Sequence, residues 1–316
     1  MKSTAFTLLS TEISHLSTAL SPIPSALSPF LLDFLPHSLS PDLLSHFPLP
    51  PIPLSLLLGF LLGVLIAVLA WRAHALTASG AAAAALTGGL IFGLGGVCWA
   101  ALLLAFFISS SGLSKAFASR KAGVHEKFSK GSRRDWGQVL ANGGLGALLA
   151  VAHAVFPSQP WPWLAFAGAM AAVNADTWAT ELGVLSSKLP RRITTGKIVE
   201  RGASGGITVL GTLAALAGAT LIGGLAALFS ARGEAVYFVG IVPLAGLLGS
   251  LFDSFLGATV QVIYRCPMCE KETERHPRHL CGAETVRIRG WSWLNNDWVN
   301  FACSLAGAIL SVILIT

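Results

Sequence analysis

Charged residues are scarce in this sequence of 316 residues, where Asp, Glu, Lys and Arg together make up 11%. Soluble domains contain about 25% charged residues, so an ordinary soluble enzyme is excluded. Cysteine is also rare, and five cysteines in a chain of this length exclude a disulfide-stabilised scaffold. Hydrophobic residues reach 53% and the mean hydropathy is +0.69, which excludes disorder. The remaining class is a helical membrane protein, in which abundant glycine lets helices pack closely.

Basic residues are nearly absent from the first 51 residues, where Lys2 is the only one. Nine of the sixteen prolines lie between residues 22 and 53. Proline interrupts helices, and a signal peptide needs a basic start and an unbroken apolar core. We therefore expect residues 1–51 to form an extension or transit segment without chemistry. Residues 52–316 are expected to form one integral membrane domain.

Apolar runs of membrane-spanning length follow this extension. A helix needs about 20 residues to cross a bilayer. The sequence predicts an all-α, polytopic bundle of about eight spans, with a tight turn at the glycines of 93–96. The expected spans are 52–71, 78–95, 96–113, 136–157, 162–187, 203–230, 236–263 and 297–315.

Eight spans place nearly all the basic loops on one side of the membrane. Arg72, at the end of the first span, and the segments 114–135, 188–202 and 265–296 together account for 19 of the 21 Lys and Arg residues. The positive-inside rule assigns these loops to the cytoplasmic, or stromal-equivalent, side. The net charge of +6 thus reflects topology, and we expect the lipid bilayer as a partner and no nucleic acid.

Two acids lie well inside predicted spans, away from their ends: Asp176 and Asp253. An acid at a helix centre costs about 2.5–3.5 kcal/mol and usually faces a partner, an ion or water. One interpretation is an acid paired for helix packing, and the other is a metal or substrate site. Helical spacing places Asn174 and Glu181 on one face and aligns Asp253 with Gln261, which favours a shared polar cleft.

The polar residues of the spans lie in the halves nearest the basic loops. Besides the two acids, these include Gln138, Asn142 and Asn300. Acids surrounded by cations are typical of a site where Mg²⁺ meets phosphates, because carboxylates hold the hard cation and bases hold the phosphate. We therefore expect Asp176 and Asp253 to bind Mg²⁺.

Two segments are candidates for phosphate binding. The first runs from Lys197 and Arg201 into an expected helix start at Ser204, Gly205 and Gly206, where free backbone N–H groups bind anions. The second is the pair Arg133 and Arg134 before the helix carrying Gln138 and Asn142. The alternatives are a plain helix cap with packing glycines for the first segment, and topology or lipid headgroups for the second.

The last basic loop contains Cys266, Cys269, His279 and Cys281. A C-x-x-C pair followed by further nitrogen and sulfur ligands is compatible with a tetrahedral zinc site. The reducing side of the membrane disfavours a disulfide. Two interpretations remain open, a structural zinc knuckle and a reduced loop without metal.

Several of these motifs occur in an order that resembles a known family. They are Arg133–Asp135 with Gln138–Gly143, Asn174–Glu181, Arg192–Thr194 with Gly202–Gly206, Gly249–Ser250 with Asp253–Ser254 and Gln261, and Gly290 with Asn295–Asn300. Together they are similar to the domain-of-unknown-function-92, or transmembrane protein 19, family across about residues 55–315. Plant members of that family are phytyl-phosphate kinases. A more distant resemblance extends to dolichol kinases, phytol kinases and CDP-diacylglycerol synthases, which use CTP and a metal.

The resemblance implies a Mg²⁺-dependent membrane phosphotransferase that converts an isoprenyl monophosphate, such as phytyl phosphate, to the diphosphate with a nucleoside triphosphate such as CTP. In this interpretation Asn174 and Glu181 support the metal or orient phosphate. A nucleotidyltransferase acting on a lipid phosphate is one alternative. A transporter that uses Asp176 and Asp253 as ion sites is another, but the apolar far halves of these helices favour a site open to one side.

Overall fold

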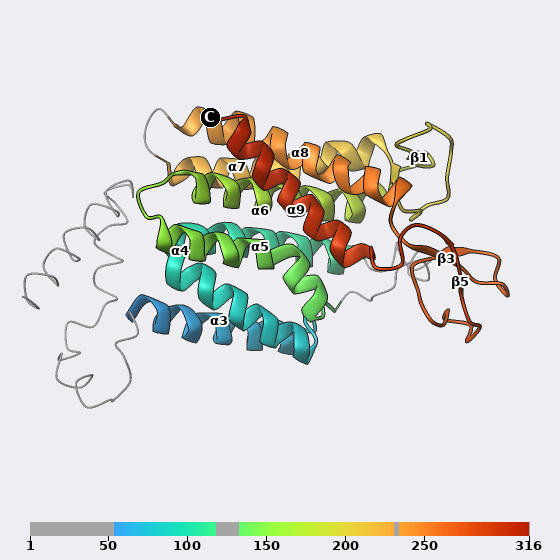
Figure 1. Ribbon diagram of the computed structural model, residues 1–316, viewed down its shortest axis with the longest axis horizontal. Helices are drawn as coiled ribbons and strands as arrows, with labels where there is room; N and C mark the ends of the chain where they lie inside the picture. Colours follow the sequence, from blue (N-terminus) through green and yellow to red (C-terminus); the bar gives the residue numbers. More distant parts are fainter. Residues whose placement is uncertain (1–53, 118–132, 231–233, 316) are drawn as a thin grey trace, which may run out of the picture.

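A computed structural model describes residues 54–117, 133–230 and 234–315. The predicted extension 1–51 and most of the basic segment 114–135 lie outside the described residues. The helices are α3 (Leu54–Arg72), α4 (Ala78–Ala116), α5 (Trp136–Val155), α6 (Trp161–Gly183), α7 (Val209–Leu228), α8 (Ala235–Thr259) and α9 (Asn296–Ile313). They form one elongated bundle with their axes roughly along its length (Figure 1).

Helix α4 is two antiparallel arms rather than one straight rod. Gly96 has φ 77° and ψ −165°, far outside helical values, in the middle of the segment. A straight helix would separate Thr77 from Ser110 by about 50 Å. Both nevertheless contact Arg134, whose carbonyl accepts from the Thr77 N–H (3.0 Å) and whose Nη2 donates to Ser110 Oγ (3.0 Å). The chain therefore reverses at the predicted glycine turn, and the described residues contain eight spanning-length helical segments.

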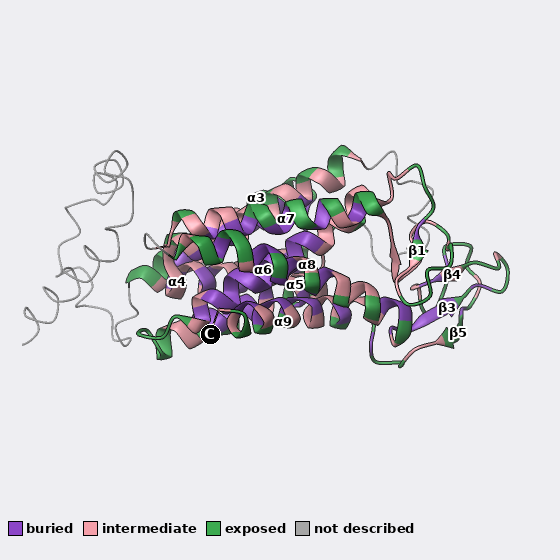
Figure 2. Cartoon of the chain, turned by 90° about the horizontal axis from the view of Figure 1, so that it is seen from above, coloured by how far each residue is buried: buried purple, intermediate pink, exposed green. Residues whose placement is uncertain are grey.

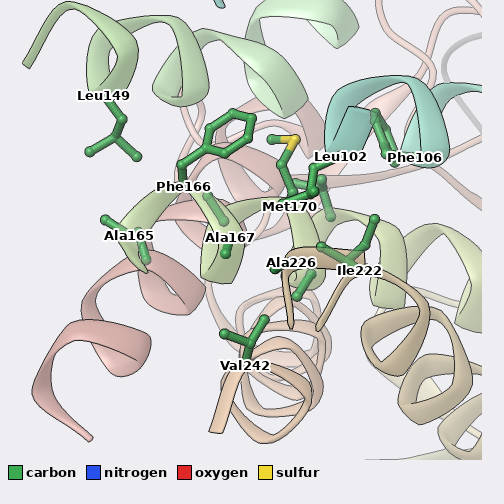
Figure 3. Close-up of a cluster of buried hydrophobic side chains, with 14 of the residues drawn as sticks. Leu102, Phe106, Leu149, Ala165, Phe166, Ala167, Met170, Ile222, Ala226 and Val242 are labelled. Atoms are coloured by element: carbon green, nitrogen blue, oxygen red, sulfur yellow. The ribbon is translucent and has the colours of Figure 1, made fainter. Parts of the chain in front are cut away.

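Helix α6 is the centre of the bundle and packs against α4, α5, α7, α8 and α9. All its residues from Leu164 to Ala175 are buried. Most of them are alanine or glycine, which allows the surrounding helices to approach closely. Phe166 and Met170 provide the bulk of the core around α6, together with Leu102 of α4 and Ile222 of α7 (Figure 3).

The outer surface of the bundle is apolar. Six of the described helices are long and apolar enough to cross a membrane, and α6, which carries Asn174 and Asp176, is not among them. Burial is concentrated on the inner helices, and the exposed residues lie on the outside (Figure 2). Helix α6, which carries Asn174 and Asp176, is thus sheltered from lipid by its neighbours.

The two long loops 184–208 and 260–295 lie at one end of the bundle, where they add small β-sheets (Figure 1). β1 (Arg191–Arg192) pairs with β2 (Gly206–Ile207), and β3 (Ile263–Arg265) lies between β4 (Glu272–Thr273) and β5 (Val286–Arg289), all antiparallel. Five exposed tryptophans mark this end of the bundle: Trp71, Trp136, Trp291, Trp293 and Trp298. Tryptophan is enriched at membrane–water interfaces, so this end lies near the lipid headgroups.

The predicted spans 162–187, 203–230 and 236–263 are each longer than the helix that forms, and α6 ends at Gly183. Residues 203–208 do not begin α7, because Thr208 is its N-cap and accepts from the Gly211 N–H (3.0 Å). Residues 260–263 do not extend α8, because Ile263 begins β3. The Gly- and Ser-rich segment at 202–206 favours a turn, and the chain leaves the helical bundle at both points.

Candidate active site

A cavity of about 300 Å³ opens at the end of the bundle where the loops collect. The ends of α5, α6, α8 and α9 surround it, and the segment 201–208 forms one wall. The residues with predicted roles that line it are Arg134, Gln138, Asn142, Asp176, Glu181, Arg201, Ser204, Gly205, Gly206, Asp253, Gln261 and Asn300. Residues from five separate segments of the sequence therefore meet in one space.

Asp176 and Asp253 enter this cavity from similar depths. Asp176 lies about 10 Å below the last residue of α6, and Asp253 about 9 Å below the last residue of α8. Ser250, one turn before Asp253, donates a hydrogen bond to Oδ1 of Asp176 (3.5 Å). The contact holds α8 against α6 so that both carboxylates line the same space.

The surroundings of Asp253 fit a hard cation. Its Oδ2 atom is buried and has no hydrogen-bond partner among the described residues. The charges that act on it come from Asp176 and Glu274, which are also acidic. Gathering carboxylates in a buried site is unfavourable unless a cation or a proton neutralises them. Carboxylate oxygens are the ligands that Mg²⁺ prefers, so this donor set suits that ion.

Glu274 also lines the cavity, although no pattern in the sequence predicts this. It follows β4 in the loop 270–278, far along the chain from α6. Its Oε1 accepts hydrogen bonds from Ser204 Oγ (3.0 Å) and from Gln261 Nε2 (2.9 Å). Gln261 is 2% exposed, so its amide is fixed by this contact. Glu274 thereby joins the segment 201–208 to the end of α8 and brings a further carboxylate to the site.

Arg134 is the cation most deeply set in the cavity wall. Its guanidinium lies over the rings of Phe106 and Phe107, 5.3 and 5.6 Å from their centroids. Burial lowers the pKa of Arg134 to about 10, and the charge of Glu181 opposes this shift. The side chain is therefore charged at neutral pH, while its buried Nη1 has no partner among the described residues. A buried N–H group of this kind is suited to hold an anion.

Glu181 and Gln138 are fixed by contacts at the cavity rim. Glu181 accepts from Ser114 Oγ (2.6 Å), at the end of the returning arm of α4. Gln138 forms a capping box with Asp135, in which each side chain accepts from the other residue's N–H. These contacts join α4 to α6 and fix the start of α5.

Three residues with predicted roles do not line the cavity. Asn174 is fully buried below it, where Nδ2 donates to the Gly218 carbonyl (2.8 Å) and Oδ1 accepts from Ser109 Oγ (3.1 Å). Arg133 is exposed and donates to the Leu76 carbonyl (3.2 Å). Lys197 is exposed in the turn after β1. Asn174 therefore joins three helices, and a direct contact with phosphate would require it to give up both hydrogen bonds.

The segment with Ser204, Gly205 and Gly206 is a turn leading into β2, so the predicted helix start is wrong. Gly205 has φ 78°, and a Cβ there would lie 2.5 Å from the backbone of Ala258. Arg201 lines the cavity, but its guanidinium donates to the Val184, Ser186 and Ser187 carbonyls after α6 (2.8, 2.5 and 3.3 Å). This segment is therefore anchored to both acid-bearing helices.

A second, apolar groove of about 100 Å³ adjoins the polar cavity. It lies between α3, the two arms of α4 and α5, and its walls are mainly Leu, Phe, Ala and Gly. Arg134, Gln138 and Asn142 line both spaces. A long hydrocarbon chain in this groove would meet the polar cavity at the buried arginine.

The four predicted zinc ligands form a separate cluster in the sheet region. The ligand atoms of Cys266, Cys269, His279 and Cys281 all lie within 4.8 Å of one another. All four belong to the loops around β3 and β4, outside the membrane-spanning helices.

Comparisons with known proteins agree with this architecture. The family described as integral membrane protein DUF92 matches residues 61–308. Protein PGR of Arabidopsis thaliana is 35% identical over 280 residues, covering 82% of this chain and 95% of that protein. An uncharacterized membrane protein of Methanocaldococcus jannaschii is 28% identical, covering 82% of this chain and 94% of its own. Protein VTE6, chloroplastic, of A. thaliana is 29% identical over 254 residues, covering 76% and 65%.

No solved structure matches the chain. The family match spans more than half of the sequence and includes all the residues that line the cavity. The chain therefore belongs to the integral membrane protein DUF92 family.

Proposed function

We propose that the protein is a membrane kinase that transfers a phosphoryl group from a nucleoside triphosphate to an isoprenyl monophosphate. The observation that carries this proposal is the junction of the polar cavity and the apolar groove at Arg134, Gln138 and Asn142. An acceptor with an anionic phosphate and a long apolar tail fits this pair of spaces. The family resemblance implies the same reaction.

The acids of the cavity support a metal-dependent transfer. Asp176 and Asp253 would hold Mg²⁺, and Glu181 and Glu274 would support the ion or its water ligands. Bound there, Mg²⁺ would neutralise phosphate charge during transfer. The fit rests on the unpartnered Oδ2 of Asp253 and on the absence of a cation acting on it among the described residues.

The remaining chemistry is positioning. The nucleophile is an acceptor phosphate oxygen, which is already anionic at neutral pH and needs no strong general base. Arg134 would bind the acceptor phosphate through its free Nη1 and orient it for in-line transfer. Gln138 and Asn142 would add hydrogen bonds at the same place. Fixed charges and donors of this kind are the main source of catalysis in phosphoryl transfer.

The cavity and the basic residues around it would face the cytoplasm or an equivalent compartment. The positive-inside rule favours that side for basic loops, and the basic loops 184–208 and 260–295 lie at the cavity end of the bundle. A nucleoside triphosphate would then reach the site from the aqueous side, and the lipid would enter from the bilayer.

Transport is the less favoured function. A transporter needs a polar path through both halves of the membrane. The half of α6 beyond Asn174, from Pro162 to Val173, is apolar, and nearly all of it is buried within the described core. The acidic and amide side chains that line the cavity from the helices around it, including Asn142, Asp253 and Asn300, lie towards the other end, which favours a site open to one side.

The test uses purified protein in lipid nanodiscs with phytyl or geranylgeranyl monophosphate, Mg²⁺ and each nucleoside triphosphate, beginning with CTP. Nucleotides labelled at the γ- or the α-phosphate separate the candidate reactions. The kinase transfers the γ-label to the lipid and releases a nucleoside diphosphate. Transfer of the α-label with release of pyrophosphate would instead identify a nucleotidyltransferase. Ion flux in proteoliposomes without either reaction would identify a transporter.

A further inference from the structure

Four side chains with sulfur and nitrogen ligands converge outside the membrane bundle. The Sγ atoms of Cys266 and Cys281 are 3.4 Å apart, and Nδ1 of His279 lies 3.6 Å from Cys269 Sγ and 3.4 Å from Cys281 Sγ. In a tetrahedral zinc site with Zn–S bonds near 2.3 Å, ligand atoms are separated by about 3.6–3.8 Å. The cluster therefore has close to the dimensions of a zinc site, with three sulfurs and one nitrogen.

The backbone presents the four ligands from two similar turns. After Cys269, Glu270 has φ 56°, and its N–H donates to the Cys266 carbonyl (2.9 Å). After Cys281, Gly282 has φ 87°, and its N–H donates to the His279 carbonyl (2.9 Å). Each turn brings its two ligands to the same side. Both turns are thus shaped to place a pair of ligands around one point.

The chemistry of the ligand set favours zinc over a disulfide or an inert loop. The Cys266 side chain is fully buried, and His279 is 5% exposed. Two metal-binding groups are therefore shielded from water in a small unit made mostly of loops. The N–H of Cys269 also donates to Cys266 Sγ (3.5 Å), a contact that stabilises a thiolate. A site of three cysteines and one histidine is fully coordinated by protein, which is typical of structural zinc.

We propose that Cys266, Cys269, His279 and Cys281 bind one structural zinc ion, which holds the Glu274 loop against the membrane cavity. Cys269 and His279 flank the loop 270–278, and Glu274 is its midpoint. Zinc closes this loop at its base, and Glu274 reaches Ser204 and Gln261 from it. The metal thus fixes a carboxylate of the candidate active site from outside the membrane.

The binding of zinc stands on the cluster alone, whereas its effect on turnover rests on the proposed function. The first measurement therefore needs no substrate. Elemental analysis of the full-length protein, purified under reducing conditions, is expected to give one zinc per chain. Cys269→Ser and Cys281→Ser should each lose most of the metal. Cys98→Ser, which changes a cysteine in α4, should keep one zinc per chain.

Two further measurements keep the proposal testable if a cysteine variant fails to fold. In the wild-type protein, exposed Cys281 should resist N-ethylmaleimide until a zinc chelator is added, as read by mass spectrometry. Refolding of the site with Co²⁺ should give the visible absorption of tetrahedral cobalt bound to thiolates. Wild-type protein without zinc, zinc retained in both cysteine variants, or a Cys266–Cys281 disulfide under reducing conditions would each overturn the proposal.

The proposed effect of zinc on the cavity, through the Glu274 loop, is tested by separate measurements. Glu274→Gln should keep one zinc per chain and lower turnover, whereas chelation should lower turnover and increase proteolysis of the loop 270–278. Full zinc occupancy with no lipid phosphorylation by the wild type would reject the proposed function and leave the metal site intact. Unchanged turnover after complete removal of zinc would reject the coupling.

Discussion

Ser250 of α8 donates a hydrogen bond to the Asp176 carboxylate of α6 at 3.5 Å. The bond joins the two helices that carry the intramembrane acids. Because Ser250 and Asp253 are one helical turn apart, they lie on the same side of α8. The contact therefore directs Asp253 into the cavity that Asp176 lines, which gives the site its paired carboxylates.

Neutralising either acid should remove activity without removing the fold. We expect Asp176→Asn and Asp253→Asn each to lower kcat about 10²–10³-fold, as the loss of one preorganised electrostatic group does in other enzymes. Asp253→Asn should also unfold at an equal or higher temperature than the wild type without Mg²⁺, because a buried charge with no partner is removed. Addition of Mg²⁺ should raise the unfolding temperature of the wild type only.

Glu234→Gln is the matched control for these variants, since Glu234 precedes the opposite end of α8. It should retain full turnover and the response to Mg²⁺. Wild-type turnover in both the Asp176 and Asp253 variants would contradict the metal assignment.

Arg134 and Arg133 are neighbours in the chain, but only Arg134 lines the cavity. Arg134→Met should raise the KM for isoprenyl monophosphate about 10–100-fold, the cost of losing a hydrogen bond to a charged group. Inorganic pyrophosphate should raise the unfolding temperature of the wild type and not of this variant. Arg133→Met should behave as the wild type in both assays, and equal defects in the two variants would indicate a general effect of surface charge.

Filling the apolar groove should discriminate between acceptors by chain length. Gly88 lines the groove, and a Cβ there would lie 4.0 Å from its nearest neighbours. A Cβ at Gly88 therefore has room, and we expect the rest of the leucine side chain in Gly88→Leu to occupy groove space that a lipid tail would need. We expect a higher KM for geranylgeranyl monophosphate and little change for a short-chain isoprenyl monophosphate.

Gly240→Leu is the control for this experiment, because Gly240 is exposed on α8 and a Cβ there meets nothing within 4 Å. It should leave both KM values unchanged. A groove variant that loses activity equally with long and short acceptors would show that the tail lies elsewhere.

The membrane bundle could be predicted from the sequence because its determinants are local. Span length, hydropathy and the placement of basic loops identify the helices, and the glycines at 93–96 predict the reversal seen at Gly96. The start of α7 and the end of α8 are harder to predict from the sequence. Apolar residues lie just before α7 and just after α8. The capping contact of Thr208 decides where α7 begins, and the pairing of β3 decides that the chain after α8 is no longer helical.

The sequence predicts which residues belong to the site only in part, because it does not show how deep along a helix the cavity reaches. Asp176 and Asn174 are close in the sequence, yet one lines the cavity and the other lies beneath it between α4 and α7. Helical periodicity gives the face of a residue but not the position of the cavity floor. Glu274 could not be predicted for another reason. An acid in a basic loop shows no pattern that indicates a role in the site, and only the tertiary structure places it beside Gln261.

Asn174 should accordingly matter for stability rather than for turnover. Asn174→Ala removes two buried hydrogen bonds, one to the Gly218 carbonyl and one from Ser109 Oγ, which should cost about 1–3 kcal/mol. The unfolding temperature in detergent should fall, while kcat and KM measured well below it should stay within about twofold of the wild type. A large loss of kcat in a stably folded variant would return Asn174 to the active site.

Substitutions at two glycines of the segment between α6 and α7 should distinguish the effect of backbone strain from the effect of close packing. Gly196 and Gly205 both have positive φ, 65° and 78°, so alanine should cost each about 1–2 kcal/mol. A Cβ at Gly196 meets nothing within 4 Å, whereas at Gly205 it would lie 2.5 Å from Ala258. Gly205→Ala should therefore displace Ser204 from Glu274 and lower turnover at least tenfold beyond the loss in Gly196→Ala. Equal turnover in the two variants would mean that close contact between this segment and α8 is not needed for activity.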